Sequence, residues 1–214
     1  MRSNVTTRTT YDRLSRWYDL ISGRSEKRLT YATLERLSPK NGETVLEIGP
    51  GTGHALVHLA QAVEPSGKVY GLDLSPGMLQ VARKRVQRAE LAAMVDFIRG
   101  DGTSMPFQAG YFDAILISFT LELFDEVEIP VVLAECRRVL KMSGCLGVVS
   151  LSRQGGVSWM VRAYDWIHRR FPSLVDCRPI LVSQVLEQIG YSVKISELRS
   201  LWGLPVELVI AEQK

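Results

Sequence analysis

From Thr44 onward, short runs of apolar residues alternate with segments in which apolar residues recur every three or four positions. Short apolar runs bounded by glycine, proline or acidic residues are typical of strands buried on both faces, and the intervening segments are typical of amphipathic helices. This alternation predicts an α/β fold, with a mostly parallel sheet covered by helices on both faces. We expect seven strands, over residues 45–48, 69–73, 95–98, 113–118, 146–150, 193–198 and 206–211.

Three helices can be placed between these strands. Ser75 followed by Pro76 offers an N-cap and a proline at the first helical position, which predicts a helix that begins there. A second helix is expected to end at Gly144, and a third is expected over residues 183–190. The apolar face of the second helix would consist of Val132, Cys136, Val139 and Leu140.

Two segments lie outside this alternation. Residues 7–36 are expected to form an N-terminal helical lid, because apolar side chains recur there at helical spacing. The repeating residues are Tyr11, Leu14, Tyr18 and Ile21. Residues 154–179 mix tryptophan with arginine and are expected to form a small helical cap between the fifth and sixth strands. Only residues 23–27 resemble a hinge, so residues 1–214 are expected to form a single domain.

Composition and charge exclude several classes of protein. A chain of 214 residues that is 46% hydrophobic and 23% charged is not intrinsically disordered. The longest apolar stretch, residues 115–124, is interrupted by Glu122 and is too short to span a bilayer. The polar, basic N-terminus predicts no secretory signal, so we expect a cytoplasmic protein. A net charge of +3 is too small to indicate a nucleic-acid partner.

The three cysteines indicate neither a disulfide framework nor a metal site. They are Cys136, Cys145 and Cys177, which are widely separated and lack CxxC spacing. That pattern argues against a disulfide framework and against a zinc site. His54 and His58 share one helix face, but no third ligand accompanies them, so no metal site is expected.

The strongest chemical signal is a glycine-rich loop after the first strand. Residues 45–53 read VLEIGPGTG, in which a buried strand runs directly into a loop containing Gly49, Gly51 and Gly53. Glycine permits positive φ angles and close approach of a ligand to the backbone. Asp73 ends the next strand, 20 residues after the last glycine, where a carboxylate can accept hydrogen bonds from ribose hydroxyls. This arrangement predicts a nucleotide-like ligand at the carboxyl end of the sheet.

The spacing of the glycines discriminates between nucleotides. A dinucleotide fingerprint would need glycine at position 54, which is His54, and the lysine of a phosphate-binding P-loop is absent. Glu47 places a carboxylate beside the loop, which would repel a diphosphate but suits a ligand with ammonium and sulfonium charge. We therefore expect S-adenosylmethionine as the cofactor. A nicotinamide-dependent dehydrogenase is the alternative, because it shares the loop and the ribose acid.

These motifs resemble the class I S-adenosylmethionine-dependent methyltransferases, and within them the UbiE-like methyltransferases of ubiquinone and menaquinone biosynthesis. The resemblance covers residues 11–211. It is carried by residues 45–53, by YGLDLSPGML at 70–79, by GD at 100–101 and by MPF at 105–107. The resemblance implies a Rossmann-like sheet of seven strands whose last strand is antiparallel.

The resemblance also implies roles for single residues in binding the cofactor. The three loop glycines would contact the methionyl part, Asp73 the ribose and Asp101 the adenine amino group. Leu74 and Met78 would flank the adenine, although core packing is the alternative for Met78, and Gly102 would offer its backbone N–H to the ring. The expected cofactor site consists of Tyr18, Glu47, Gly49, Pro50, Gly51, Gly53, Asp73, Leu74, Met78, Asp101, Gly102 and Ser118.

The loop after the fourth strand differs from the loop of these relatives. They resemble Ser-Phe-Gly-Ile/Leu-Arg-Asn here, whereas residues 118–123 read SFTLEL, without the arginine and the asparagine. Glu122 is the expected catalytic residue, and it would favour a cationic or amine acceptor; a solvated loop carboxylate is the alternative. The loop also lacks the Asp/Asn-Pro-Pro-Tyr/Phe motif of the enzymes that methylate nucleobases, which disfavours DNA and RNA substrates.

The acceptor is expected to lie beneath the lid and the cap. Tyr11 and Trp166 are the candidate substrate-binding residues, with plain packing as the alternative for each. The aromatic and basic residues 159–171 also suit peripheral contact with a membrane surface.

The sequence thus predicts an S-adenosylmethionine-dependent methyltransferase that acts on a small, partly apolar or lipid-like molecule. A binding protein that keeps the cofactor pocket without catalysis is a further alternative, suggested by the altered loop at residues 120–123. The sequence sets neither the oligomeric state nor the atom that is methylated.

Overall fold

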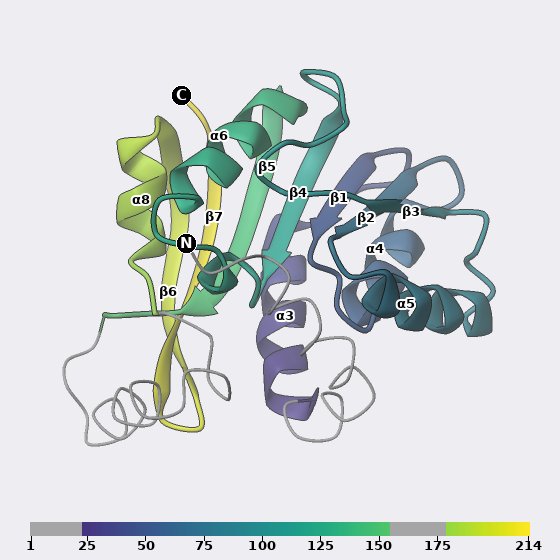
Figure 1. Cartoon of the computed structure of the whole chain (residues 1–214), viewed down its shortest axis with the longest axis horizontal. Helices are drawn as coiled ribbons and strands as arrows, with labels where there is room; N and C mark the ends of the chain where they lie inside the picture. The colour runs from purple at the N-terminus through teal and green to yellow at the C-terminus, as the bar shows by residue number, and fades with distance from the viewer. Residues whose placement is uncertain (1–22, 155–178) are drawn as a thin grey trace.

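The computed structural model describes residues 23–154 and 179–214, which form a seven-stranded sheet with helices on both faces (Figure 1). The strands are β1 (Thr44–Ile48), β2 (Lys68–Asp73), β3 (Val95–Arg99), β4 (Phe112–Ser118), β5 (Leu140–Leu151), β6 (Tyr191–Leu201) and β7 (Leu204–Gln213). The helices are α3 (Gly23–Leu37), α4 (His54–Val63), α5 (Pro76–Arg88), the short 3₁₀ helix η1 (Leu121–Leu123), α6 (Ile129–Val139) and α8 (Val182–Gln188). All seven predicted strands are present, which confirms the α/β fold.

The strands follow the order β3-β2-β1-β4-β5-β7-β6. The pairs between β1, β2, β3, β4 and β5 are parallel, whereas β7 runs antiparallel to both β5 and β6. The expected antiparallel last strand is therefore confirmed. The chain winds outward from β1 to β3 on one side and from β4 onward on the other, so the strand order reverses between β1 and β4. Sheets of this kind bind ligands beyond the carboxyl ends of the strands at such a reversal.

Both faces of the sheet are buried. Along β1, Leu46 and Ile48 pack in the hydrophobic cluster that includes α6 and α8, whereas Val45 packs in the cluster that includes α3, α4 and α5. Successive side chains of a strand point to opposite faces, so a strand covered on both faces is apolar at nearly every position. This double burial explains the continuous apolar runs in the sequence.

The predicted helix starts agree with the structure. Helix α5 begins at Pro76, and the Ser75 hydroxyl accepts a hydrogen bond of 3.2 Å from the backbone N–H of Met78, as an N-cap should. Helix α8 lies within one to two residues of its predicted bounds. None of the helices in the described residues is long and apolar enough to cross a membrane.

The predicted end of the second helix is wrong. Helix α6 ends at Val139, and Leu140 belongs to β5, where it pairs with Phe112. Gly144 is therefore no helix cap. It lies where the register between β4 and β5 shifts, and a Cβ there would lie 2.8 Å from the carbonyl oxygen of Asp113. Close backbone approach, which only glycine allows, accounts for this residue.

The predicted hinge at residues 23–27 is also wrong, because α3 begins at Gly23 and runs through this stretch. The rest of the predicted lid, residues 7–22, and nearly all of the predicted cap, residues 155–178, lie outside the described residues. The predicted site residues Tyr11, Tyr18 and Trp166 lie there too.

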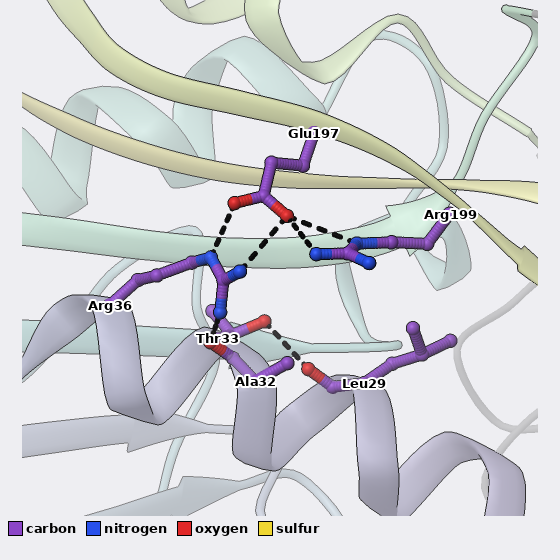
Figure 2. Close-up of polar contacts among 6 residues, drawn as sticks. All are labelled: Leu29, Ala32, Thr33, Arg36, Glu197 and Arg199. Carbon is purple, nitrogen blue, oxygen red and sulfur yellow. Dashed lines mark hydrogen bonds and ion pairs between the residues drawn. The ribbon is translucent and has the colours of Figure 1, made fainter.

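Helix α3 is fastened to the edge of the sheet. Figure 2 shows Glu197 of β6 between Arg36 of α3 and Arg199. Arg36 Nε donates to Glu197 Oε1 at 2.6 Å, and Arg36 Nη2 donates to Oε2 at 3.1 Å, while Arg199 donates to the same Oε2. A hollow of about 510 Å³ between α3 and the β6–β7 turn is lined in part by these two arginines. The ion pairs fix the position of α3 relative to β6.

Ser152 and Ile180 lie side by side at the carboxyl end of β5. The backbone N–H of Ile180 donates to the carbonyl of Leu151 at 3.0 Å. Glu207 of β7, which is fully buried, accepts from the backbone N–H groups of Val182 at 3.0 Å and Ser183 at 3.3 Å. Glu207 therefore fixes the start of α8 against β7.

We expect Glu207→Gln to lower the free energy of unfolding by about 2 kcal/mol, because the amide turns one N–H group toward a buried backbone donor. Glu212→Gln on the same strand is the matched control, because Glu212 is partly exposed and pairs with Lys194 at 3.2 Å. Its loss should be under about 1 kcal/mol. Urea unfolding of the two variants measures the difference, and equal losses would contradict the role given to Glu207.

Candidate active site

The carboxyl ends of β1 to β4 meet at one edge of the sheet, and the loops that follow them carry the predicted site residues. Within the described part of the chain, these residues are Glu47, Gly49, Pro50, Gly51, Gly53, Asp73, Leu74, Met78, Asp101, Gly102, Ser118 and Glu122. Loops far apart in the sequence are thus brought to a single edge (Figure 1).

The loop after β1 adopts a backbone that requires glycine. The φ angles of Gly49, Gly51 and Gly53 are +65°, +50° and +79°. A Cβ at Gly53 would lie 2.9 Å from the Cα and the Cβ of Ala82, so this glycine lets the loop pack directly on α5. At Gly51, in contrast, a Cβ would meet no atom within 4 Å. Gly51 therefore borders open space, where a ligand can approach the backbone.

The loop after β4 closes against the loop after β1. Phe119 has a φ of +48°, which turns the chain so that Thr120 lies against Gly49. Thr120 Oγ1 is 3.2 Å from the carbonyl oxygen of Gly49, to which it donates. A Cβ at Gly49 would lie only 2.4 Å from the Thr120 side chain. Strained backbone of this kind is concentrated at functional sites.

Glu47 is a buried carboxyl group beside the glycine loop. Its side chain is 2% exposed, and its Oε2 has no hydrogen-bond partner among the described residues. Burial and, to a smaller extent, the charge of Asp73 raise the pKa of Glu47 to about 8. A buried carboxylate without a partner is costly unless it is protonated or meets a cation. The position therefore fits a positively charged ligand such as S-adenosylmethionine.

The turn after β2 presents one of the two expected adenine contacts to solvent. Asp73 Oδ1 accepts from the backbone N–H of Ser75 at 2.8 Å, which fixes the start of α5. The Leu74 side chain is 46% exposed, whereas that of Met78 is 5% exposed within the core side of α5. Leu74 is thus available to an aromatic ring, whereas Met78 is buried, and its contact with the adenine stays a prediction.

The loop after β3 is fixed by two residues of α6 that the sequence did not indicate. Asp101 Oδ1 accepts from the backbone N–H of Thr103 at 2.8 Å, which forms a tight turn. Glu135 Oε2 accepts from the backbone N–H of Met105 at 2.8 Å, and Arg138 donates to the Met105 carbonyl at 3.0 Å. Glu135 and Arg138 also pair with each other at 2.6 Å. They follow no motif, so only the fold shows their role.

Gly102 in this loop is buried under an aromatic ring. A Cβ at Gly102 would lie 3.1 Å from Phe124 Cζ and 3.7 Å from Ile48 Cγ2. The bare glycine thus lets η1 and its flanking Phe124 pack close to the loop after β3. Its backbone contact with a cofactor stays a prediction.

Helix α3 contacts the end of β4. Ser118 at the tip of β4 shares a hydrogen bond of 2.7 Å with the hydroxyl of Thr30 in α3. Thr30 Oγ1 also lies 3.0 Å from the carbonyl oxygen of Glu26, one turn earlier in the helix. This contact brings the first two turns of α3 over the carboxyl ends of the strands.

Glu122 is buried, so its interpretation as a solvated loop carboxylate is wrong. Its side chain is 1% exposed, and Oε1 accepts a long bond of 3.4 Å from the backbone N–H of Leu151. Burial raises the pKa of Glu122 to about 7. Burial and the charge of Glu122 also raise the pKa of Glu26 to about 7. Glu122 and Glu26 are thus two carboxyl groups whose pKa values are raised mainly by burial.

His58 of α4 packs against Tyr31. The ring centroids of His58 and Tyr31 are 4.1 Å apart. Within residues 23–154 and 179–214, no three side chains of histidine, cysteine, aspartate or glutamate are grouped as a metal ion would require.

Comparisons with known proteins identify methyltransferases as relatives of this chain. A family model described as a methyltransferase domain matches residues 45–144. Demethylmenaquinone methyltransferase from Geobacillus sp. is 37% identical over 63% of this chain and 55% of its own length. The same enzyme from Oceanobacillus iheyensis is 30% identical over 77% of this chain and 68% of its own length.

Solved structures share the fold. A SAM-dependent methyltransferase from Aquifex aeolicus superimposes with a TM-score of 0.68 and 22% identity, over 94% of this chain and 98% of the Aquifex chain. At this identity the likeness shows the arrangement of the sheet and helices. The alignment with the Geobacillus relative spans little more than half of that protein's length.

Proposed function

Because the chain belongs to the S-adenosylmethionine-dependent methyltransferase family that includes demethylmenaquinone methyltransferase, we propose that it transfers a methyl group from this cofactor to a small, partly apolar acceptor. The observation that carries the proposal is the loop after β1. Its Gly51 borders open space, and the buried Glu47 beside it lacks a partner among the described residues. A loop of this geometry, with a carboxyl in place of phosphate-binding groups, suits a cationic adenosine compound.

Each part of the cofactor has a candidate partner in the chain. The glycine loop and Glu47 would hold the methionyl part, Asp73 the ribose, and Leu74 with the Asp101 loop the adenine. When bound, S-adenosylmethionine supplies a methyl group that is made electrophilic by its sulfonium sulfur. The chain's own contribution is to place the acceptor in line with that methyl group and to keep water out.

The acceptor would lie on the β4–β5 side of the glycine loop. Apolar side chains surround this region, since Leu29 of α3 and Phe119 pack against Leu151 of β5. The bridge between Ser152 and Ile180 lies there as well. These neighbours support an acceptor with apolar parts, in keeping with relatives named for a quinone. Peripheral contact with a membrane, which would bring a lipid-like acceptor, stays a prediction.

We also propose that the protein works in the cytoplasm. Cys136 is a buried free thiol and Cys145 a partly buried one, and thiols persist in a reducing compartment.

Gly51→Ala tests the cofactor site directly. A methyl group at this residue has room, so the variant should fold with a strain cost of about 1 kcal/mol and lose at least about tenfold in affinity for S-adenosylmethionine. Gly110→Ala is the matched control, because Gly110 has a φ of +64° and also meets no atom within 4 Å. Calorimetry with S-adenosylmethionine, and with NAD for comparison, measures the binding.

The outcomes separate the competing functions. Gly110→Ala should bind S-adenosylmethionine like the parent, at the same strain cost as Gly51→Ala. Saturable binding of NAD without binding of S-adenosylmethionine would indicate a dehydrogenase instead. Binding of S-adenosylmethionine without transfer of labelled methyl groups into a metabolite extract would indicate a non-catalytic binding protein.

A further inference from the structure

We propose that the hollow between α3 and the β6–β7 turn is a binding site for a small aromatic carboxylate. This site goes beyond the proposed function and does not depend on it. The hollow has a volume of about 510 Å³, which is within the range of sites that bind small molecules. Cations, an indole ring and apolar side chains meet in its walls, which include Arg28, Leu29, Ala32, Arg36, Arg199 and Trp202.

Two of the arginines keep N–H donors that the chain itself does not use. Arg36 uses each of its donor nitrogens, because Nε and Nη2 donate to Glu197 and Nη1 donates to the Ala32 carbonyl at 2.9 Å (Figure 2). Arg199 donates to Glu197 through Nε and Nη2, and its Nη1 has no hydrogen-bond partner among the described residues. Arg28 forms neither an ion pair nor a side-chain hydrogen bond within residues 23–154 and 179–214. Unused donors are therefore present on both the α3 wall and the β6 wall.

The charge of the hollow favours an anion. Arg36 and Arg199 share the single carboxylate of Glu197, so these three side chains together are positively charged. Arg28 adds a further positive charge, and Glu35, an exposed residue of α3, offsets only one of the charges. A guanidinium group matches the two oxygens of a carboxylate with parallel N–H donors. The contact with Glu197 shows that arginines of this hollow do hold a carboxylate.

Trp202 occupies its place in the hollow at a cost in backbone energy. Strands β6 and β7 are joined by the two-residue turn Trp202-Gly203, in which the φ angles are +50° and +81°. Turns of this kind prefer asparagine or aspartate at the first position, because other side chains are strained at a positive φ. Trp202 is nevertheless 52% exposed, so core packing does not account for it. An exposed aromatic residue on strained backbone is a feature of binding sites.

The apolar part of the hollow suits the flat body of an aromatic ligand. Leu29 and Ala32 lie about one turn apart on the face of α3 that lines the hollow. Leu29 also packs against the apolar cluster that includes Leu201 and Val206, which fixes its position. A ring would therefore pack between this face and the indole of Trp202, and its carboxylate would accept from the unused arginine donors.

2-Naphthoate is a probe that combines a ring with a carboxylate. Titration calorimetry of the full chain should show saturable binding of one molecule, at least about tenfold tighter than that of 2-naphthalenemethanol, which has the ring without the charge. Acetate, which has the charge without the ring, should bind at least about tenfold more weakly than 2-naphthoate. Binding of 2-naphthoate should also weaken as sodium chloride is raised from about 0.05 M to about 0.5 M.

Single substitutions assign the probe to the hollow. Arg28→Gln and Arg199→Gln each remove a cation with unused donors, so each should weaken 2-naphthoate binding by about tenfold or more. Trp202→Asn removes the ring and supplies a residue that the turn prefers, so binding should fall while the free energy of unfolding is kept or raised. Arg88→Gln, at an exposed position of α5 outside the hollow, is the matched control and should bind 2-naphthoate like the parent. Urea unfolding reports that each variant is folded.

The contrary outcomes are equally specific. Equal affinity for 2-naphthoate and 2-naphthalenemethanol, or no saturable binding of either, would overturn the site. Binding that survives both Arg28→Gln and Trp202→Asn would place the probe elsewhere, and an equal loss in Arg88→Gln would indicate attraction to the positive surface in general; either result would overturn it. Saturating S-adenosylhomocysteine should leave the affinity for 2-naphthoate unchanged, and competition between the two would put the probe in the cofactor site and contradict the proposal.

Discussion

Without cofactor, the protein should become less stable as the pH rises from about 5.5 to about 8.5. Burial raises the pKa of Glu47 to about 8, and those of Glu26 and Glu122 to about 7. Their ordinary value is 4.5, so each group holds its proton more tightly in the folded chain than in the unfolded chain. The stabilising contribution of each group is therefore complete below its ordinary pKa. It is lost as the pH rises through the raised value.

We expect a loss of up to about 7 kcal/mol over this range, because a shift of one pKa unit corresponds to about 1.4 kcal/mol. Ion pairing with arginine lowers the pKa values of Glu135 and Glu197 below 4.5, so both stay charged throughout the range and offset none of the loss. Urea unfolding at several pH values measures this loss in the free energy of unfolding. Glu47→Gln should flatten the dependence, whereas Glu187→Gln, at an exposed position of α8, should keep it. Constant or rising stability with pH would contradict the burial of these carboxyl groups.

Cofactor should restore part of the lost stability at alkaline pH. The positive charges of S-adenosylmethionine favour the ionised form of Glu47, so binding should strengthen as the pH rises through about 8 and should release a proton below that value. Glu47→Gln removes this linkage as well. If the cofactor stabilised the protein equally at both ends of the pH range, Glu47 would lie away from the positive charges of the bound S-adenosylmethionine.

The sheet could be predicted from the sequence because its central strands are covered on both faces. The apolar runs in β1 and β4 stand out against the polar loops that follow them, and the Ser75-Pro76 pair marks the start of α5 by local chemistry alone. The helix before β5 could not be ended correctly in this way. Leu140 continues the helical spacing of α6 but pairs with Phe112, so a tertiary contact overrides the local pattern.

The glycine loop after β1 could also be predicted from the sequence. Its positive φ angles and close backbone contacts are readily adopted by glycine alone. Gly51 and Gly53 show both uses, one beside open space and the other against α5. A motif of this kind is local in the chain, and the topology places it at the edge where Asp73 also ends a strand.

The acceptor side was less accessible to sequence analysis. Glu122 interrupts an apolar run, and nothing in the sequence distinguishes a charged residue that reaches solvent from one that is enclosed. It is enclosed where the end of β5 lies beside the loop, since the backbone N–H of Leu151 donates to Glu122 at 3.4 Å. Thr120 is similar, because its contact with Gly49 exists only when the loops after β1 and β4 meet. Contacts of this kind depend on the strand order, so no local sequence pattern predicts them.

Gly49→Ala should lower the free energy of unfolding by about 3 kcal/mol or more, through two separable terms. The first is backbone strain, since Gly49 has a φ of +65° and a side chain in this region costs about 1–2 kcal/mol. The second is overlap, because the new Cβ would lie 2.4 Å from Thr120 Oγ1 and Cγ2. Gly42→Ala is the matched control for the first term alone, since Gly42 has a φ of +85° and a Cβ there would meet no atom within 4 Å.

A double-mutant cycle with Thr120→Gly isolates the overlap. Thr120→Gly removes all three side-chain atoms that lie within 3.0 Å of the new methyl group, so Gly49→Ala in that background should cost no more than Gly42→Ala does in the parent. The coupling measured by urea unfolding should then be about 1–2 kcal/mol and favourable in the double variant. Additive losses would mean that the loops after β1 and β4 stand farther apart than described. In that case Thr120 would not hold the loop after β4 against the loop after β1.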